Sequence, residues 1–386
     1  MASAPSERRT VLIVDDSALV RRVVRDAIEA SPDFRVAGEA SNGTDALRAV
    51  HALDPDLVTM DIAMPGLSGL ETLGCLMSEF PRPVVMLSGQ ETAAGAELTI
   101  RALELGAVDF VRKPSSGDAL DETTLRHRLL QALRAAAGVR VAPPVSDAQP
   151  ARSWRATRAP VPPPATGDAP GRGPARHVIV VASSTGGPRA LAELIPRLSL
   201  TEGTAVVIVQ HMPEQFTTSL AHRLSELGPR PVVETSDDAP LLAGIVYLAR
   251  GGRHTRVVRS ASGEPRVVHD GTAPVHAVRP AADPLFESAA IAFGPEVTAV
   301  VLTGMGRDGA QGSLEIRRRG GTVIVQEPSS CVVGGMGASV LAVAGADAVV
   351  VLAEIPATLA TRGAPRVIPV AAGQTARDAD RGPVVL

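Results

Sequence analysis

The sequence predicts an α/β protein with two domains, each built on a parallel sheet covered by helices. Three observations support this prediction. The chain has 386 residues, 45% of them apolar and 20% charged, so it is too long for one ordinary domain and too apolar for disorder. Residues 136–176 contain nine prolines in 41 positions and divide the chain. On both sides of this segment, short β-branched runs alternate with amphipathic stretches, which is typical of parallel strands connected by helices.

Residues 8–135 are expected to form the first domain. Its predicted strands are residues 10–14, 35–38, 57–60, 84–87 and 108–111. Five strands separated by helices predict a doubly wound sheet, whose ligands bind at the carboxyl ends of the strands. Residues 1–135 carry a net charge of −6, so this is the acidic part of the chain.

Residues 136–176 are expected to be a flexible linker. A stretch rich in Pro, Ala and Arg, without a periodic apolar face, cannot bury enough surface to offset its ordering entropy. The only Trp of the chain, Trp154, lies in this stretch and is either a chance residue or an anchor for another protein. Residues 363–386 have a similar composition and are expected to be a disordered tail.

Residues 177–362 are expected to form the second domain. Its predicted strands are residues 178–181, 205–209, 232–234, 246–248, 256–258, 298–302 and 322–325. Amphipathic stretches lie between most of these strands, so a second α/β domain with a parallel sheet is predicted.

The composition excludes several classes of protein. A formal net charge of −3 gives no general attraction to nucleic acid or to anionic membranes. Two cysteines provide neither a disulfide framework nor a thiolate metal cage, so we expect a reduced, cytoplasmic protein. The N-terminal residues do not resemble a signal peptide, and the longest apolar stretch is interrupted by Asp347 and Glu354, so direct membrane insertion is not expected.

Polar side chains follow several predicted strands of the first domain. Asp15 and Asp16 follow the first strand and Asp61 follows the third. Each Asp alone could cap a helix, but three carboxylates in one crevice repel one another, and Mg²⁺ would relieve that repulsion. Ser88 ends the fourth strand, and Lys113, the only Lys of the chain, ends the fifth. A hydroxyl and a compact ammonium beside a metal-bound carboxylate suit an incoming phosphoryl group.

Through these residues the first domain resembles the receiver domain of two-component response regulators, which has a flavodoxin-like fold. The resemblance implies phosphorylation at Asp61 by a histidine kinase, Mg²⁺ ligation by Asp15, Asp16, Asp61 and the backbone carbonyl of Ala63, phosphoryl contacts from Ser88 and Lys113, and a switching role for Phe110. It also implies a cis peptide bond before Pro114.

A second candidate site begins at Ser184. The predicted strand 178–181 is followed by Ser184-Thr185-Gly186-Gly187 and then a helix, whose first N–H groups are free to bind an anion. The turn could cradle a phosphate, or Ser184 could be a nucleophile with an oxyanion hole beside it. The spacing does not decide between them, because the turn is neither G-x-S-x-G nor a Walker A loop.

A nucleophilic serine needs a base. His211 ends the next predicted strand, in Gln210-His211-Met212-Pro213, and Asp308 follows another strand, in Gly304-Met305-Gly306-Arg307-Asp308. Alone, His211 could be a turn residue and Asp308 a helix cap. Together, the three would meet at one sheet edge in the order Ser, His, Asp, which differs from the usual α/β-hydrolase order.

Through these three motifs the second domain resembles the catalytic domain of bacterial chemotaxis protein-glutamate methylesterases. A receiver joined to it by a linker is the layout of that family. The resemblance implies hydrolysis of glutamate γ-methyl esters, and deamidation of glutamines, on methyl-accepting chemoreceptors, with the chemotaxis histidine kinase as phosphodonor and no cofactor for the esterase. It assigns Ser184 as nucleophile, His211 as base, Asp308 as the residue that orients His211, and the N–H groups of Thr185 and Met305 as oxyanion donors.

Two departures from the family pattern bear on substrate fit. Val278 stands where a His commonly precedes Arg-Pro, and Gly337 ends a segment that commonly reads Tyr-Gly-Met-Pro. The residues also leave two other functions open: an esterase or amidase acting on a protein outside chemotaxis, and a response regulator whose output domain only binds DNA or a partner. We expect no nucleic acid partner, because Arg317-Arg318-Arg319 is the only basic cluster of the second domain.

Overall fold

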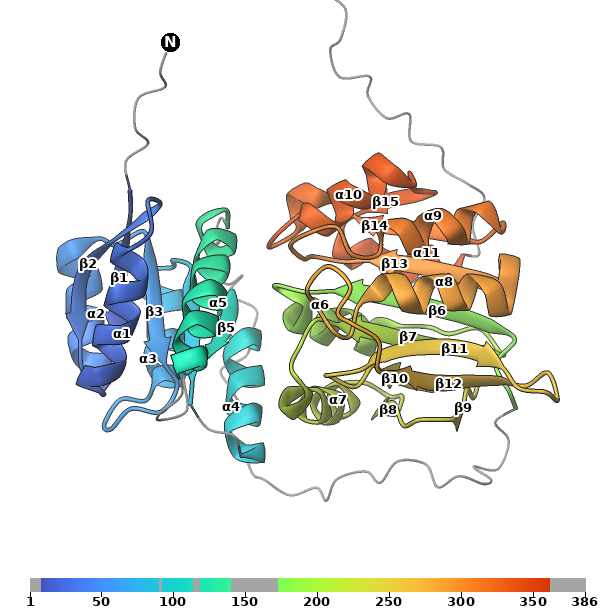
Figure 1. Cartoon of the computed structure of the whole chain (residues 1–386), viewed down its shortest axis with the longest axis horizontal. Helices are drawn as coiled ribbons and strands as arrows, with labels where there is room; N and C mark the ends of the chain where they lie inside the picture. The colour runs from blue at the N-terminus through green and yellow to red at the C-terminus, as the bar shows by residue number, and fades with distance from the viewer. Residues whose placement is uncertain (1–7, 90–91, 114–118, 140–172, 362–386) are drawn as a thin grey trace, which may run out of the picture.

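The structure is a computed structural model that describes residues 8–89, 92–113, 119–139 and 173–361. It contains two α/β domains (Figure 1). Trp154, Pro114 and the predicted tail lie outside the described residues. The ends of the predicted linker differ from the prediction, because helix α5 continues to Ala137 and Ala175 is buried. The Ala175 N–H donates to the carbonyl of Leu241, which joins this end to the second domain.

The N-terminal domain is a five-stranded parallel sheet in the order β2-β1-β3-β4-β5. Its strands are β1 (Arg9–Val14), β2 (Phe34–Ala40), β3 (Leu57–Asp61), β4 (Val84–Ser88) and β5 (Asp109–Arg112). Its helices are α1 (Ala18–Glu29), α2 (Gly43–Leu53), α3 (Gly69–Glu79), α4 (Ala93–Glu104) and α5 (Ala119–Ala137). The predicted doubly wound sheet is confirmed, with each strand within two residues of its predicted ends.

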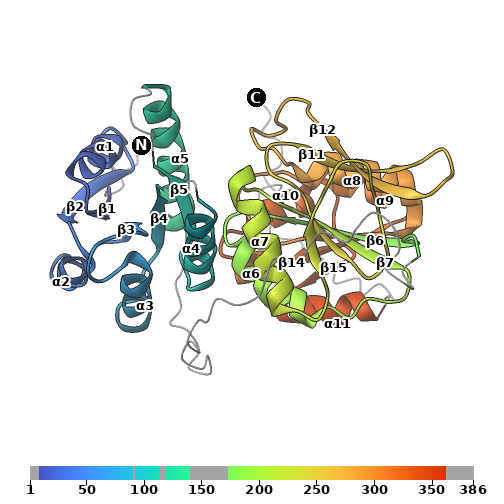
Figure 2. The ribbon, with the colours of Figure 1, turned by 90° about the horizontal axis from the view of Figure 1, so that it is seen from below.

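Local sequence explains where these helices begin. Ser17, Asn42, Ser68 and Thr92 each accept a hydrogen bond from the third N–H of α1 to α4 respectively. Helices α1 and α5 cover one face of the sheet, and α2, α3 and α4 cover the other (Figure 2). The central strands are therefore buried on both faces, which is why they read as continuous apolar runs.

The C-terminal domain contains a seven-stranded parallel sheet in the order β15-β14-β13-β6-β7-β10-β8. Its strands are β6 (His177–Ser183), β7 (Thr204–Gln210), β8 (Val232–Glu234), β10 (Val246–Leu248), β13 (Val297–Val301), β14 (Thr322–Gln326) and β15 (Ala348–Val350). Its helices are α6 (Gly187–Leu194), α7 (Glu214–Leu227), α8 (Ala282–Phe293), α9 (Ala310–Arg318), α10 (Gly335–Val343) and α11 (Ile355–Ala360), with short 3-10 turns between some of them. The predicted parallel sheet is confirmed.

A small antiparallel sheet was not predicted. It pairs β11 (His254–Arg259) with β12 (Pro265–Asp270) and β12 with β9 (Ala239–Pro240). The predicted strand 256–258 lies in β11 and therefore belongs to this sheet, not to the parallel one. Strand β9 has only two residues, and β12 begins with a proline. Neither segment therefore shows the alternation of apolar and polar residues that predicts a strand. Val257 and Val267 bury this sheet in the same apolar cluster as α8.

The two domains are in contact. Helix α4 and strand β5 of the N-terminal domain lie beside α6 and α7 of the C-terminal domain in both views (Figures 1 and 2). Arg223 of α7 donates from Nε to Glu104 of α4 at 2.8 Å. Phe110 of β5 packs on Phe216 of α7, with ring centroids 4.5 Å apart. The N-terminal domain therefore faces the carboxyl end of the second sheet.

Candidate functional site

The first candidate site lies at the carboxyl end of the N-terminal sheet. Asp15 follows β1 and Asp61 ends β3, and both are buried, whereas Asp16 is exposed. Carboxylate oxygens of the three lie within 4.8 Å of one another. Lys113 follows β5 and places its Nζ 2.7 Å from Asp15 Oδ2 and 2.9 Å from Asp61 Oδ1. The structure thus brings together four of the residues that the sequence predicted for this site.

These contacts set the charge balance of the site. Burial raises the pKa of Asp61, and the Lys113 ammonium only partly offsets this. Three carboxylates beside one ammonium leave an excess of negative charge, and an all-oxygen donor set of this kind suits Mg²⁺. Asp15, Asp16 and Asp61 therefore fit a magnesium ion. Ala63 lies next to them, with its N–H 3.3 Å from Asp61 Oδ1.

Two further predicted residues of this domain, Ser88 and Phe110, contact elements at the boundary with the second domain. Ser88 ends β4, and its buried hydroxyl shares a hydrogen bond with Thr99 Oγ1 of α4 at 3.1 Å. Phe110 contacts Phe216 of the second domain directly. Both residues therefore touch elements that form the contact between the domains.

The second candidate site lies at the carboxyl end of the C-terminal sheet. Ser184 follows β6, His211 follows β7, and Asp308 lies between β13 and α9. Because β13, β6 and β7 are neighbours in the sheet, the three residues meet at one edge. They line one cleft of about 570 Å³. The structure thus brings together the three residues that the sequence predicted.

His211 and Asp308 form a close pair. His211 Nε2 lies 2.6 Å from Asp308 Oδ2, and the Asp308 carboxylate also accepts N–H groups from Ala282 and Asp283. Burial raises the pKa of Asp308, but the hydrogen bonds from His211 and from the two N–H groups outweigh it, so the pKa lies below its ordinary value. Because the ionised carboxylate only accepts, the imidazole proton lies on Nε2 and Nδ1 is an acceptor.

Ser184 and His211 are held in place by a neighbour that the sequence analysis gave no role. The Gln210 amide donates from Nε2 to the carbonyl oxygens of Ser184 at 2.9 Å and His211 at 3.2 Å. Its Oε1 accepts the Ser183 hydroxyl at 2.7 Å. Within the described part of the chain the Ser184 hydroxyl makes no hydrogen bond, either to His211 or to any other residue.

Thr185 and Met305, the predicted oxyanion donors, lie in the same cleft. Neither backbone N–H donates to another residue in the described ranges. The absence of a side chain at Gly304 lets this loop approach the nucleophile, because a Cβ there would lie 2.8 Å from the Ser184 Cβ and 2.3 Å from Met336 Sδ. Free N–H groups beside a serine are what an oxyanion site requires.

The N-terminal domain forms one wall of this cleft. Asp109 and Phe110 line it together with Ser184. The Thr185 hydroxyl donates to Asp109 Oδ2 at 2.8 Å. Burial raises the pKa of Asp109 by more than the hydrogen bonds from the Phe110 N–H and from Thr185 lower it. No sequence signal predicts this contact, because it depends on how the domains dock.

Comparison with known proteins identifies both domains. Residues 11–126 match the response regulator receiver domain, and residues 179–359 match CheB methylesterase. A protein-glutamate methylesterase/protein-glutamine glutaminase of Pyrococcus abyssi is 38% identical over 349 residues, which are 90% of this chain and 92% of the relative. A protein of the same name from Symbiobacterium thermophilum is 44% identical over 334 residues, 84% of this chain and 89% of the relative. The chain belongs to this methylesterase family.

Two solved structures are also similar to its domains. The Thermotoga maritima CheB methylesterase catalytic domain is 39% identical, with a TM-score of 0.46, and the match covers 47% of this chain and 96% of that one. The response regulator domain of Thermotoga maritima CheB is 40% identical, with a TM-score of 0.32, and the match covers 35% of this chain and 99% of that one. The two domains are called the receiver and the methylesterase domain below.

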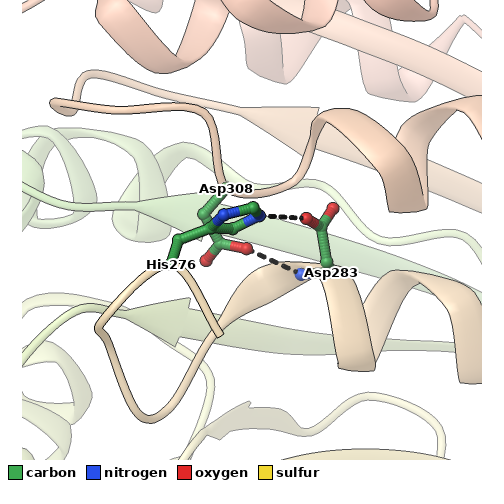
Figure 3. Close-up of side chains that lie close together, drawn as sticks. All are labelled: His276, Asp283 and Asp308. Carbon is green, nitrogen blue, oxygen red and sulfur yellow. Dashed lines mark hydrogen bonds and ion pairs between the residues drawn. The ribbon is translucent and has the colours of Figure 1, made fainter. Parts of the chain in front are cut away.

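The methylesterase domain contains a hydrogen-bonded cluster that the sequence analysis missed (Figure 3). His276 Nε2 lies 2.9 Å from Asp283 Oδ2, and the Asp283 N–H donates to Asp308 Oδ1 at 3.0 Å. The Gly312 N–H donates to the other Asp283 oxygen. Although ligand atoms of the three side chains lie within 4.8 Å of one another, each carboxylate oxygen already accepts a hydrogen bond. The cluster therefore fits a positioning network for Asp308 better than a metal site.

The two departures from the family pattern lie in different surroundings. Val278 lines the cleft, as expected, and His276 lines it two residues earlier. Gly337 is buried in α10, where a Cβ would lie 3.0 Å from Val325 Cγ1. It is not among the described cleft residues, so any effect of this departure on substrate fit would be indirect. Its neighbour Met336 packs beneath the cleft against Gly304.

Proposed function

We propose that this protein is a phosphorylation-controlled protein-glutamate methylesterase. Its substrates would be glutamate γ-methyl esters, and also glutamines, of methyl-accepting chemoreceptors. The observation that carries the proposal is the meeting of Ser184, His211 and Asp308 at the ends of three neighbouring strands. The printed names of the curated relatives support the substrate class, and the receiver domain supports control by phosphorylation.

In the proposed reaction Ser184 is the nucleophile. Its Oγ attacks the ester carbonyl while its proton passes to His211 Nδ1, and Asp308 stabilises the imidazolium through Nε2–H. The N–H groups of Thr185 and Met305 hold the oxyanion. The imidazolium then protonates the leaving oxygen and methanol departs. Water, deprotonated by His211, hydrolyses the acyl-serine and releases glutamate; with a glutamine substrate the leaving group is ammonia.

The receiver supplies the control in this proposal. Asp61 would take a phosphoryl group from a chemotaxis histidine kinase. Mg²⁺, held by Asp15, Asp16, Asp61 and the carbonyl of Ala63, would supply positive charge for the phosphoryl oxygens. Lys113 and Ser88 would contact the same oxygens from the ends of β5 and β4.

Phosphorylation would act by opening the cleft. Asp109 and Phe110 form a wall of the cleft in the unphosphorylated chain. The Ser88–Thr99 hydrogen bond joins the phosphorylation site to α4, which also carries Glu104. A phosphoryl group on Asp61 would draw the Ser88 hydroxyl away from Thr99 and so favour an arrangement of α4 that does not dock on the second domain. The equilibrium between the docked and open arrangements would shift by the difference in the free energy with which the phosphoryl group interacts with each of them.

The same proposal places the protein in the cytoplasm, where the kinase and the receptor segments that it would modify are found. Among the described helices none is both long and apolar enough to cross a bilayer. We propose that the first domain, which extends through α5 to Ala137, serves phosphorylation, and that the second, which begins by Ala175, serves hydrolysis.

The test measures methanol released from methyl-labelled receptor membranes, with and without a small acyl phosphate as phosphodonor. Ser184→Ala should lower release at least about a hundredfold while Asp61 is still phosphorylated. Asp61→Asn should keep the basal release and lose the stimulation. Normal release by Ser184→Ala would refute the triad, and no release by the stimulated parent would refute the substrate class.

A further inference from the structure

Arg307 lines the cleft, and among the described residues no carboxylate pairs with its guanidinium. It is exposed on the loop between β13 and α9, one residue before Asp308. In the described ranges the only hydrogen bond of its side chain runs from Nε to His276 Nδ1, at 3.2 Å. The oxygens of Asp283 and Asp308 accept other donors, so neither carboxylate pairs with this guanidinium. Arg279, another arginine of the cleft, donates instead to the carbonyl oxygens of Gly271 and Thr272.

The group that holds Arg307 is neutral. Because His276 Nδ1 accepts from Arg307, the imidazole proton lies on Nε2, where it is donated to Asp283. A neutral partner orients the guanidinium without cancelling its charge. The two terminal nitrogens of Arg307 are left as a planar fork, which is the geometry that binds a carboxylate through two parallel hydrogen bonds.

The backbone that presents His276 is unusual. Val275 and Val278 exchange two backbone hydrogen bonds, at 3.2 and 3.0 Å, across a two-residue turn. The residues within the turn, His276 and Ala277, have φ values of +52° and +62°, a region that favours glycine and asparagine. Non-glycine residues held in this region are concentrated at functional sites. The turn places the ring at the cleft, where it contacts Arg307.

We propose that Arg307, oriented by His276, is a subsite for a carboxylate of the protein substrate, supplied by an Asp or Glu side chain near the methyl ester. This inference rests on the proposed function and adds a preference for acidic sequence around the modified glutamate. Arg307 is two residues after Met305, the proposed oxyanion donor, and two residues span at most about 7 Å. Side chains one turn apart on a helix lie about 5–6 Å apart, so an acidic residue one turn from the ester would reach the fork.

The test compares two peptides with one glutamate methyl ester each, one with Glu and one with Gln a helical turn away. The enzyme is the full chain stimulated with a small acyl phosphate. Arg307→Gln should raise KM for the Glu peptide at least about tenfold, because the substitution removes a charge-assisted hydrogen bond to the substrate. The kcat of this variant should stay within about twofold of the parent value. KM for the Gln peptide should not change. Arg307→Lys, which keeps the charge but not the fork, should be intermediate.

The matched control is Arg318→Gln, which removes the same charge from an exposed position in α9 outside the cleft. It should leave both KM values unchanged. Equal KM values for the two peptides with the parent, or an equal rise for both in Arg307→Gln, would overturn the inference while leaving the esterase proposal standing.

Binding separates the two proposals. We expect the Ser184→Ala chain to bind the Glu peptide more tightly than the Gln peptide, and the Ser184→Ala, Arg307→Gln chain to lose this difference. If the parent hydrolysed neither peptide but this difference persisted, the carboxylate subsite would stand and the proposed reaction would fail.

Discussion

Thr185 of the methylesterase domain donates its hydroxyl to Asp109 of the receiver at 2.8 Å. Thr185 directly follows the proposed nucleophile, and its N–H is a proposed oxyanion donor. A receiver carboxylate therefore lies at the point where negative charge would develop during hydrolysis. The contact both covers the cleft and places an acidic group beside the oxyanion site, so its removal should be measurable in the rate.

Asp109→Ala should raise the basal rate of the unphosphorylated chain. Without Asp109 the buried Thr185 hydroxyl loses its acceptor in the docked arrangement, which costs about 1–3 kcal/mol and shifts docking about fivefold or more. The measurement is methanol release without phosphodonor. The control is Asp26→Ala, which removes an exposed carboxylate from α1, away from the contact. An unchanged basal rate would show that this bond does not hold the receiver in place.

Docking of the receiver should weaken as pH rises. Burial raises the pKa of Asp109, and the nearby Arg128 only partly opposes this. The docked form therefore binds the Asp109 proton more tightly than the free form. Docking is favoured by this proton below the ordinary pKa, and the benefit is lost as pH rises through the raised pKa.

The measurement compares the basal rates of the parent and of Asp109→Asn from below the ordinary pKa of an aspartate to above the raised pKa of Asp109. The asparagine amide does not titrate in this range, so the variant reports the pH dependence of all other groups. The ratio of parent to variant should rise with pH. A constant ratio would show that Asp109 has the same charge in both arrangements.

Glu104→Gln should also favour the open arrangement, but by less. The Arg223 guanidinium contacts Glu104 through Nε and Nη2, at 2.8 and 3.0 Å, and the pair is partly exposed. Pairs of this kind stabilise by up to about 1 kcal/mol, which corresponds to about a fivefold rise in basal rate at most. Glu193→Gln, which removes an exposed pair within the methylesterase domain, is the control. A larger effect of the control than of Glu104→Gln would contradict the proposed role of α4.

The strand-end residues could be predicted from the sequence for a physical reason. Parallel strands bring their carboxyl ends to one edge, so Asp61 and Lys113, or Ser184 and His211, had to be near one another once the strands were recognised. The ends of a strand follow from the local run of apolar and β-branched residues, which can be recognised in a single sequence.

Other parts of the site depend on interactions that the sequence does not display. The position of His276 follows from a two-residue turn with positive φ at both residues, and neither of them is glycine or asparagine. The Asp109–Thr185 bond follows from docking of two domains, which depends on surface shape and not on periodicity. Gly337 was placed near substrate from motif position alone, whereas packing buries it in α10.

Lys113→Arg tests whether the receiver needs a compact ammonium. Nζ of Lys113 lies within 3 Å of oxygens from both Asp15 and Asp61, so a single charged atom bridges the two carboxylates. A wide planar guanidinium cannot occupy that position in the same way. Phosphorylation of Asp61 should persist while stimulation of hydrolysis weakens, measured as phosphoryl incorporation and methanol release on the same sample. Equal stimulation in parent and variant would show that any cation serves.

Gly304→Ala should damage the active site without disturbing the receiver. The new Cβ would lie 2.3 Å from Met336 Sδ and 2.8 Å from the Ser184 Cβ. The Met336 side chain can change rotamer, but the Ser184 Cβ is fixed to the backbone at the end of β6, so the nucleophile itself must move. Overpacking of this kind costs about 1–3 kcal/mol in unfolding free energy.

Displacement of a nucleophile from its base and oxyanion donors also slows the reaction, so methanol release should fall at least about tenfold. Phosphorylation of Asp61 should stay at the parent level, because the substitution lies in the other domain. Gly74→Ala is the matched control, since a Cβ at Gly74 in α3 meets nothing within 4 Å. Alanine is the better helix former there, so this control should stabilise the receiver by about 0.5–1 kcal/mol and leave hydrolysis unchanged. If Gly304→Ala hydrolysed esters at the parent rate, Ser184 could not depend on close approach of the loop between β13 and α9, and the assignment of Met305 as oxyanion donor would fail with it.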